Sequence, residues 1–242
     1  CYDNSMDNIS LEKQHAAIAA TLLIKNGMTV GLGTGSTVTF FLNALAKRMR
    51  RENLSITGVT TSFKTEIIAQ NLGIKIVDID DVATIDLTID GADEVDYDMN
   101  GIKGGGAAFL MEKIVANNSK RIVWIVDSQK VHLKLGLMPL PLEVVPFGSG
   151  KLMTELTKQH LYPTWRKKDG KLLVTDMGHY IVDLSLKTID QPYELARYLD
   201  GKIGIVEHGL FLDIADEIII GTTTGVEYLF RSDSVSYTHL TL

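Results

Sequence analysis

One stretch of the chain, from Asp90 to Glu112, concentrates residue types that could move a proton on a small anionic substrate. It carries an acidic turn, a lone lysine and three consecutive glycines, followed by a glutamate that enters a predicted helix. Carboxylates and an ammonium group can hold sugar hydroxyls and stabilise a developing negative charge, and a well-placed carboxylate can act as a general base. The stretch therefore indicates acid–base chemistry on a polyhydroxylated anion.

A second glycine-rich turn, GLGTGST from Gly31 to Thr37, directly follows a short apolar strand. Small residues let the backbone approach an anion, and the helix predicted from Val38 presents free N–H groups to it. Ser36 and Thr37 add hydroxyl donors. The turn lacks the third glycine and the acidic residue of a dinucleotide site, and it lacks the Gly-Lys-Ser/Thr of a P-loop. We predict a phosphate site, with a plain strand-to-helix turn as the alternative.

Two acidic residues, Asp90 and Asp93, follow the strand predicted at Leu87–Ile89. In open α/β sheets, ligands bind in the crevice at the carboxyl ends of the strands, so we expect both side chains at a site. The triglycine Gly104–Gly106 after Lys103 suggests that a ligand approaches the backbone there, because a structural turn needs fewer glycines.

Calcium is a competing interpretation of the acidic segment, because Asp96 and Asp98 begin a pattern like that of an EF-hand loop. The twelfth position, which must supply a bidentate glutamate, is Ala107, and Lys103 would put a cation inside the loop. We therefore predict no metal site and interpret Asp96 and Asp98 as solvated surface charges.

Glu112 lies about one and a half turns into the predicted helix, so its side chain can point back toward the triglycine. Lys130 follows the apolar strand Arg121–Val126 and would lie at the same edge of the sheet. The alternatives are an exposed helix glutamate and an ordinary surface lysine.

Strands and helices alternate over the first half of the chain, which predicts an α/β fold with a doubly wound, mostly parallel, Rossmann-like sheet. The first helix is predicted at Ile9–Asn26, with Ser10 as its N-cap. After Pro139 the alternation of strands and helices ends, and the pattern predicts a small α+β unit with a ferredoxin-like order of elements. We expect a catalytic domain over 7–135 plus 208–230, an inserted domain over 136–207, and disordered or non-native tails at 1–6 and 231–242.

Composition limits the possible functions. The 242 residues carry a net charge of −6 and no long Lys/Arg run, which argues against nucleic acid and anionic membranes as partners. The single cysteine, Cys1, excludes a disulfide framework and a thiolate metal cluster. No apolar run is long enough to span a bilayer, and no signal-peptide pattern begins the chain. We expect a cytoplasmic protein.

Four motifs together resemble ribose-5-phosphate isomerase of the A type: TGST at Thr34–Thr37, DGAD at Asp90–Asp93, KGGG at Lys103–Gly106, and Glu112. Their order and spacing agree, and the similarity covers roughly residues 7–229. The segment GTTTG at Gly221–Gly225 departs from the family, in which a proline and an acid are expected.

The resemblance implies an aldose–ketose isomerase that acts on a sugar phosphate through an enediolate, without a cofactor and as a homodimer. It implies that Glu112 shuttles the proton, that Lys103 and the triglycine amides face the enediolate oxygens, and that Asp90 and Asp93 assist ring opening. The substrate-binding residues that it implies are Thr34, Gly35, Ser36, Thr37, Gly91, Ala92, Gly104, Gly105, Gly106, Lys130 and Lys13.

Two other classes of protein fit parts of this set of motifs. A sugar-phosphate sensor would keep the phosphate turn without needing Glu112, but it would normally carry a DNA-binding helix-turn-helix, which the segment before the first strand is too short to hold. A CoA transferase shares the sheet architecture and uses a glutamate as nucleophile, but it leaves Lys103 and the paired aspartates unexplained.

Overall fold

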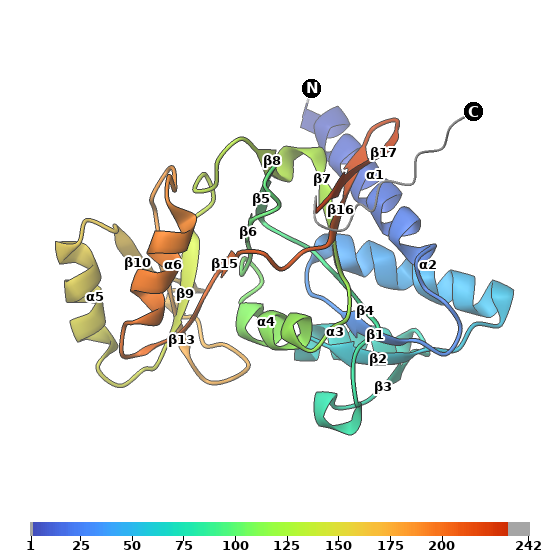
Figure 1. Ribbon diagram of the computed structural model, residues 1–242, viewed down its shortest axis with the longest axis horizontal. Coiled ribbons are helices and arrows are strands. Elements are labelled where there is room, and N and C mark those ends of the chain that lie inside the picture. Colours follow the sequence, from blue (N-terminus) through green and yellow to red (C-terminus); the bar gives the residue numbers. More distant parts are fainter. Residues whose placement is uncertain (1, 232–242) are drawn as a thin grey trace.

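The computed structural model describes residues 2–231, with side chains from Asp7 onward, and its largest element is a seven-stranded sheet (Figure 1). The strands lie in the order β17-β16-β7-β4-β1-β2-β3, and every neighbouring pair is parallel except β16 and β17. The strands are β1 (Thr29–Leu32), β2 (Thr57–Thr60), β3 (Lys75–Ile76), β4 (Leu87–Asp90), β7 (Ile122–Asp127), β16 (Glu217–Thr222) and β17 (Gly225–Phe230).

Helices cover both faces of this sheet, as expected for a doubly wound fold. One core joins α1, α2 and α3 to the sheet through residues such as Ala16, Phe41 and Ala69. A second core packs Phe109 of α4 near Trp124 on the opposite face. β7 is buried along its whole length, because helices or strands cover both of its sides. The helices are α1 (Tyr2–Thr21), α2 (Ser36–Glu52), α3 (Phe63–Asn71) and α4 (Phe109–Asn117).

The ends of the chain differ from the sequence-based expectation. α1 begins at Tyr2, so Ser10 lies inside the helix, and the prediction that it caps a helix starting at Ile9 was wrong. The backbone of residues 2–6 belongs to this helix, and the expectation that residues 1–6 are a disordered or non-native tail stays a prediction. At the other end, Arg231 Nε donates a hydrogen bond to Ala215 O at 3.1 Å, so Arg231 belongs to the fold. Residue 1 and residues 232–242 lie outside the described residues.

A four-stranded antiparallel sheet in the order β10-β13-β9-β14 forms the smaller unit, at the left of Figure 1. With its two helices it has the ferredoxin-like order of elements. The elements are β9 (Leu140–Val144), α5 (Ser149–Lys158), β10 (Pro163–Trp165), β13 (Tyr180–Leu184), α6 (Pro192–Asp200) and β14 (Ile205–His208), with a minor pair, β11 (Lys167–Lys168) and β12 (Lys171–Leu172). The boundaries at 136 and 207 stay a prediction.

A third sheet lies between the two units and was not predicted from the sequence. Its order is β15-β6-β5-β8, and each strand is only two or three residues long. Strands this short leave too few residues for a period-2 pattern to emerge. They are β5 (Glu94–Asp96), β6 (Gly101–Ile102), β8 (Val131–His132) and β15 (Leu210–Phe211). Two 3-10 turns, η1 (Ile79–Asp81) and η2 (Ser128–Lys130), complete the described chain, in which no helix is long and apolar enough to cross a membrane.

Candidate active site

The site forms where β1 and β4 end side by side. The two strands are parallel neighbours, with Leu32 paired to Ile89, so the turns that follow them emerge at the same edge of the sheet. Asp90 Oδ1 accepts hydrogen bonds from the backbone N–H of Thr34 at 3.0 Å and of Gly91 at 2.7 Å. A Cβ at Gly33 would lie 2.0 Å from that oxygen, so only glycine allows this approach. The two turns are thus bound together through one carboxylate.

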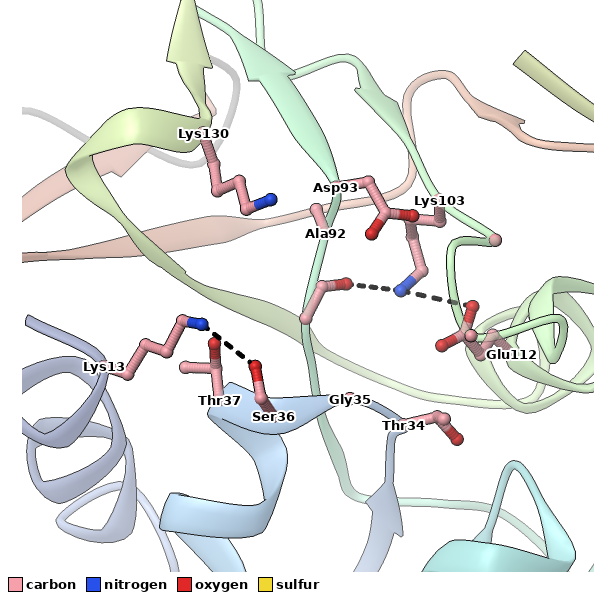
Figure 2. Close-up of a pocket in the computed structure, with 13 residues that line it drawn as sticks. Lys13, Thr34, Gly35, Ser36, Thr37, Ala92, Asp93, Lys103, Glu112 and Lys130 are labelled. Atoms are coloured by element: carbon pink, nitrogen blue, oxygen red, sulfur yellow. Dashed lines mark hydrogen bonds and ion pairs between the residues drawn. The ribbon is translucent and has the colours of Figure 1, made fainter. Parts of the chain in front are cut away.

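The start of α2 forms one end of the pocket. Gly35 is the N-cap with φ 120°, a conformation that L side chains rarely adopt, and no side chain caps the helix. The first N–H groups of a helix lack intrahelical partners and, with the helix dipole, favour an anion. Lys13 Nζ, from α1, donates to Ser36 Oγ at 3.0 Å, and Lys130 reaches in from η2 (Figure 2). This end of the pocket therefore presents cations, hydroxyls and free amides together.

Lys103 reaches the opposite end of the pocket by way of the third sheet. The chain leaves β4, forms β5, turns back through β6 and arrives at Lys103, whose backbone N–H donates to Gly209 O at 2.9 Å. The side chain is only 2% exposed. The third sheet therefore aims a buried ammonium group at the ends of the central strands.

Two carboxylates surround the Lys103 ammonium. Nζ lies 3.0 Å from Asp90 Oδ2 and 3.4 Å from Glu112 Oε2, and it donates to Gly91 O. Burial alone would lower the pKa of Lys103, but the charges of Asp90 and Glu112 outweigh burial and raise the pKa above its ordinary value. Lys103 therefore stays cationic at neutral pH.

Glu112 is buried in the first turn of α4 with its carboxylate toward the pocket (Figure 2). Burial, followed by the neighbouring Asp90 charge, raises the pKa of Glu112 well above its ordinary value, although Lys103 opposes the shift. Glu112 Oε2 has no hydrogen-bond partner, because its contact with Lys103 is an ion pair without hydrogen-bond geometry. A carboxylate with a raised pKa that lines the pocket is suited to accepting a proton.

Asp93 lies on the pocket wall beside the triglycine turn. Its Oδ2 accepts the backbone N–H of Gly105 at 2.6 Å. A Cβ at Gly105 would lie 2.6 Å from Asp93 Oδ1, which explains one of the three glycines. The N–H of Gly105 is therefore already bound to a carboxylate, and of the triglycine only Gly104 and Gly106 line the pocket.

All of the predicted site residues except Asp90 and Gly105 line this one pocket. Asp90 is 3% exposed, and its oxygens are bound to Thr34, Gly91 and Lys103. Its carboxylate therefore supports the pocket lining from behind, and its role in ring opening stays a prediction. The remaining predicted residues come from α1, α2, α4, η2 and the turns after β1, β4 and β6, as Figure 2 shows for those that it labels.

The calcium-like segment has a structural role in the fold. Asp96 Oδ1 accepts the N–H of Asn100 at 2.9 Å and closes the turn between β5 and β6. Asp96 is 7% exposed, so its interpretation as a solvated surface charge was wrong, and burial raises its pKa. Within residues 7–231, Asp200, Glu207 and His208 form a grouping with the spacing of metal ligands. The ammonium group of Lys113 lies 2.6 Å from the Glu207 carboxylate, so a cation of the protein already pairs with this grouping.

Sequence reasoning missed several residues that support the site. Thr34 Oγ1 contacts the hydroxyls of Thr61, Ser62 and Thr65 at 2.8–3.3 Å, behind the phosphate turn. Arg166, from the smaller unit, donates to Gly104 O at 2.5 Å. The run TTS at Thr60–Ser62 was a usable signal, because it follows a strand that ends at the same edge. Nothing local marks Arg166, which lies far from the site in sequence.

The arrangement combines an anion-binding end with a proton-accepting end. The helix start, Lys13 and Lys130 suit a phosphate, while Glu112, Lys103 and Asp93 surround the other end of the pocket. A base beside a fixed cation can remove a proton next to a carbonyl and stabilise the resulting enediolate. The pocket therefore suits proton transfer on a short phosphorylated chain.

Comparisons with known proteins give a consistent result. A family model described as ribose 5-phosphate isomerase A (phosphoriboisomerase A) matches residues 57–225. Ribose-5-phosphate isomerase A of Bifidobacterium longum is 54% identical over 214 residues, which is 88% of this chain and 92% of that protein. The protein of that name from Lactococcus lactis subsp. cremoris is 48% identical over 225 residues, which is 93% of this chain and 99% of that protein.

Solved structures agree with these sequence matches. A D-ribose-5-phosphate isomerase in complex with phospho-erythronic acid superposes with a TM-score of 0.90 at 37% identity, covering 93% of this chain and all of that one (100%). The ribose 5-phosphate isomerase A of Methanocaldococcus jannaschii has a TM-score of 0.86 at 36% identity, with coverage of 90% and 98%. The α/β fold expected from the sequence is confirmed by these structures.

Proposed function

This chain belongs to the ribose-5-phosphate isomerase A family and is an isomerase, and from that premise we propose that it interconverts D-ribose 5-phosphate and D-ribulose 5-phosphate. The observation that carries the proposal is Glu112, a buried carboxylate with a raised pKa and an oxygen without a hydrogen-bond partner. It shares a pocket with an anion-binding helix start. The reaction belongs to the non-oxidative branch of the pentose phosphate pathway.

The substrate phosphate binds at the start of α2. The amides of the first turn, the hydroxyls of Ser36 and Thr37, and the ammonium groups of Lys13 and Lys130 surround it. The carbon chain then extends toward Lys103 and Glu112. Binding energy from the remote phosphate can be used to hold the reacting carbons in position.

Ring opening comes first, because ribose 5-phosphate closes a ring between C1 and O4. Asp93 accepts the proton of the O1 hydroxyl as the C1–O4 bond breaks and returns that proton to the departing O4, so that the aldehyde and a C4 hydroxyl result. Asp93 suits this role better than Asp90, because Asp93 lines the pocket while both Asp90 oxygens are bound within the protein. We therefore assign Asp90 to orienting Lys103.

Proton transfer between carbons follows. Glu112 removes the C2 proton, and the electron pair moves into the C1 carbonyl to give an enediolate whose oxygens face Lys103. The O2 hydroxyl loses its proton, O1 gains one, and Glu112 returns its proton to C1. One carboxylate on one face of the planar intermediate performs both transfers, and no electron leaves the substrate, so the proposed route uses no cofactor.

The direct test replaces Glu112 by glutamine, which keeps the size of the side chain but removes its basicity. Loss of a general base typically costs about 10²–10⁴ in rate, and we expect kcat to fall by at least that much in a coupled assay. Binding of phospho-erythronic acid, the ligand of the solved relative, should change little. A variant that keeps more than about a tenth of wild-type kcat would place the base elsewhere.

We further propose that the protein works as a cytoplasmic homodimer, as the family resemblance implies. Sedimentation equilibrium at micromolar concentration would test the oligomeric state, and a monomeric mass would contradict it.

A further inference from the structure

Arg166 of the smaller unit donates a hydrogen bond to the active-site turn at Gly104. Arg166 follows β10, and its backbone N–H donates to Ile181 O at 2.9 Å, which fixes the residue against β13. Its guanidinium binds the Asp183 carboxylate with Nε at 2.8 Å and also with Nη2, while Nη1 donates to Gly104 O at 2.5 Å. Both side chains are mostly buried, so solvent screens this contact less than a surface ion pair.

Gly104 O and the N–H of Gly105 belong to the same peptide group. The described chain has no cis peptide bonds, and in a trans peptide the carbonyl and the N–H point in opposite directions. The carbonyl accepts from Arg166, and the N–H donates to Asp93 Oδ2 at 2.6 Å. Arg166 and Asp93 therefore bind the two ends of one peptide.

The charges along this chain of contacts alternate. Asp183 is negative and Arg166 positive, the peptide carbonyl faces the guanidinium, and the peptide N–H faces the Asp93 carboxylate. Hydrogen bonds with a charged partner are about twice as strong as neutral ones, and bonds in series polarise one another. The order of charges therefore holds the peptide plane in one orientation.

The glycines allow this orientation. Gly104 has φ 120°, and a Cβ there would lie 2.6 Å from both Phe109 and Pro141. Rotation of the Gly104–Gly105 peptide would break the contact with Asp93, whose Oδ1 already lies close to the Gly105 backbone. The glycines leave the peptide free to turn, and the arginine fixes it.

We propose that Arg166, held by Asp183, is a positioning residue that orients the Asp93 carboxylate through the Gly104–Gly105 peptide. The smaller unit thereby takes part in ring opening without contacting the substrate. The inference rests on the proposed function, because it takes Asp93 as the group that opens the ring.

A second contact between the units supplies a matched control. Asp176 Oδ2 accepts the N–H of Phe63 at 3.1 Å, at the start of α3, and neither residue lines the pocket that holds Asp93. Asp176→Ala removes a contact between the units without touching the triglycine turn. Comparing Asp176→Ala with Arg166→Met separates an effect on the orientation of Asp93 from an effect of weakening the contact between the two units.

The first measurement is turnover of ribose 5-phosphate. We expect Arg166→Met to lower kcat about 10–100-fold with little change in KM, since displacing a reacting group through its supporting contacts typically costs that much. The kcat and KM of Asp176→Ala should stay near the wild-type values. If Arg166→Met does not fold because Asp183 loses its partner, the variant Arg166→Met/Asp183→Asn leaves no unpaired charge and should show the same loss.

Coupling to Asp93 is the decisive comparison. Asp93→Asn and the double variant Asp93→Asn/Arg166→Met should have the same kcat within about threefold, because the arginine acts only through that carboxylate. If the kcat losses of the two single variants instead multiply in the double variant, Arg166 acts independently of Asp93, and the inference is overturned.

Proton exchange separates ring opening from the carbon–proton transfer. Ribulose 5-phosphate is acyclic because its O5 carries the phosphate, so deuterium uptake at C1 in D2O requires Glu112 but no ring chemistry. The ratio of exchange to conversion should rise in Arg166→Met and in Asp93→Asn and stay unchanged in Asp176→Ala. An unchanged ratio in Arg166→Met would overturn the inference. A wild-type protein without turnover would instead contradict the proposed function and this inference with it.

Discussion

Glu112 is held in an environment that favours its neutral form. Burial, followed by the charge of Asp90, raises the pKa of Glu112 in the folded protein above its value in the unfolded chain. For a raised pKa, the stabilising contribution is fully present below the unfolded pKa and is lost as the pH rises through the folded pKa. As the pH rises above the ordinary carboxylate pKa, the free energy of unfolding therefore falls until the folded side chain has also ionised.

Glu112→Gln, which resembles the neutral acid, should for this reason melt at a higher temperature than the wild type at pH 7. About 1 kcal/mol corresponds to a shift of roughly 2–4 °C at this chain length, which calorimetry resolves easily. The difference in melting temperature should shrink toward zero below about pH 4, because the wild-type glutamate is then protonated and carries no charge, like the glutamine. Glu227→Gln, at an exposed position on β17, is the control. A lower melting temperature for Glu112→Gln at pH 7 would contradict the assigned direction of the shift.

Lys130 lines the end of the pocket that we propose binds the phosphate, and its removal should affect substrate binding. A charge-assisted contact is worth about 1.5–3 kcal/mol, so Lys130→Met should raise KM for ribose 5-phosphate about 10- to 100-fold and change kcat less. Lys120→Met removes a lysine that pairs with Asp86 before β4, away from the pocket, and is the matched control. Equal KM values for wild type and Lys130→Met would place the phosphate elsewhere.

Among the elements, the regular ones followed from the sequence and the short ones did not. The continuous apolar run at Arg121–Val126 predicted a strand buried on both faces, and β7, at Ile122–Asp127, is one. The strands β5, β6 and β15 have no such signal, because each is only two or three residues long, and β15 pairs with a strand far away in sequence. The site residues on the turns after β1, β4 and β6 were predictable because glycine and charge cluster there. Arg166 was not, since only tertiary packing brings it to Gly104.

The triglycine turn leads to a prediction about one methyl group. In Gly105→Ala the new Cβ would lie 2.6 Å from Asp93 Oδ1, so the carboxylate must rotate away. We expect kcat to fall about tenfold or more with little change in melting temperature, because Gly105 is exposed and its φ is not in the left-handed region.

Gly150→Ala is the matched control, because a Cβ at that position in α5 meets nothing within 4 Å. It should stabilise the protein by about 0.5–1 kcal/mol and leave kcat unchanged, since alanine favours the helix. Full activity in Gly105→Ala would show that Asp93 does not need its observed orientation.

At the scale of the whole molecule, the two units are interlocked. Lys113 Nζ on α4 donates to His208 O and Leu210 O at 2.9 and 3.0 Å, where the chain returns from the smaller unit. Gly209 donates to Pro141 O at 2.8 Å and accepts from the N–H of Lys103 at 2.9 Å. The backbone that carries Lys103 is therefore bound to the segment that joins the two sheets, and we expect both units to unfold together.

The protein's two tryptophans allow a test, because Trp124 lies in the large sheet and Trp165 in the small one. In Trp165→Phe, Trp124 fluorescence reports the large unit alone, while far-UV circular dichroism reports both. The two denaturant midpoints should coincide for a cooperative transition. A second transition visible only by circular dichroism would show that the smaller unit unfolds independently.

The packing of α1 has a consequence for biosynthesis. α1 packs against β16 and β17, where His15 Nδ1 contacts Thr222 O at 2.7 Å, and a Cβ at Gly221 would overlap Glu12 O. Lys13 lies between those two contacts, so its place in the pocket depends on strands that the ribosome makes about 200 residues later. At about 5–20 residues per second, the delay is on the order of 10–40 s. During translation the part of α1 that β16 covers therefore stays accessible to chaperones, and Lys13 reaches its place in the pocket only after β16 has left the exit tunnel.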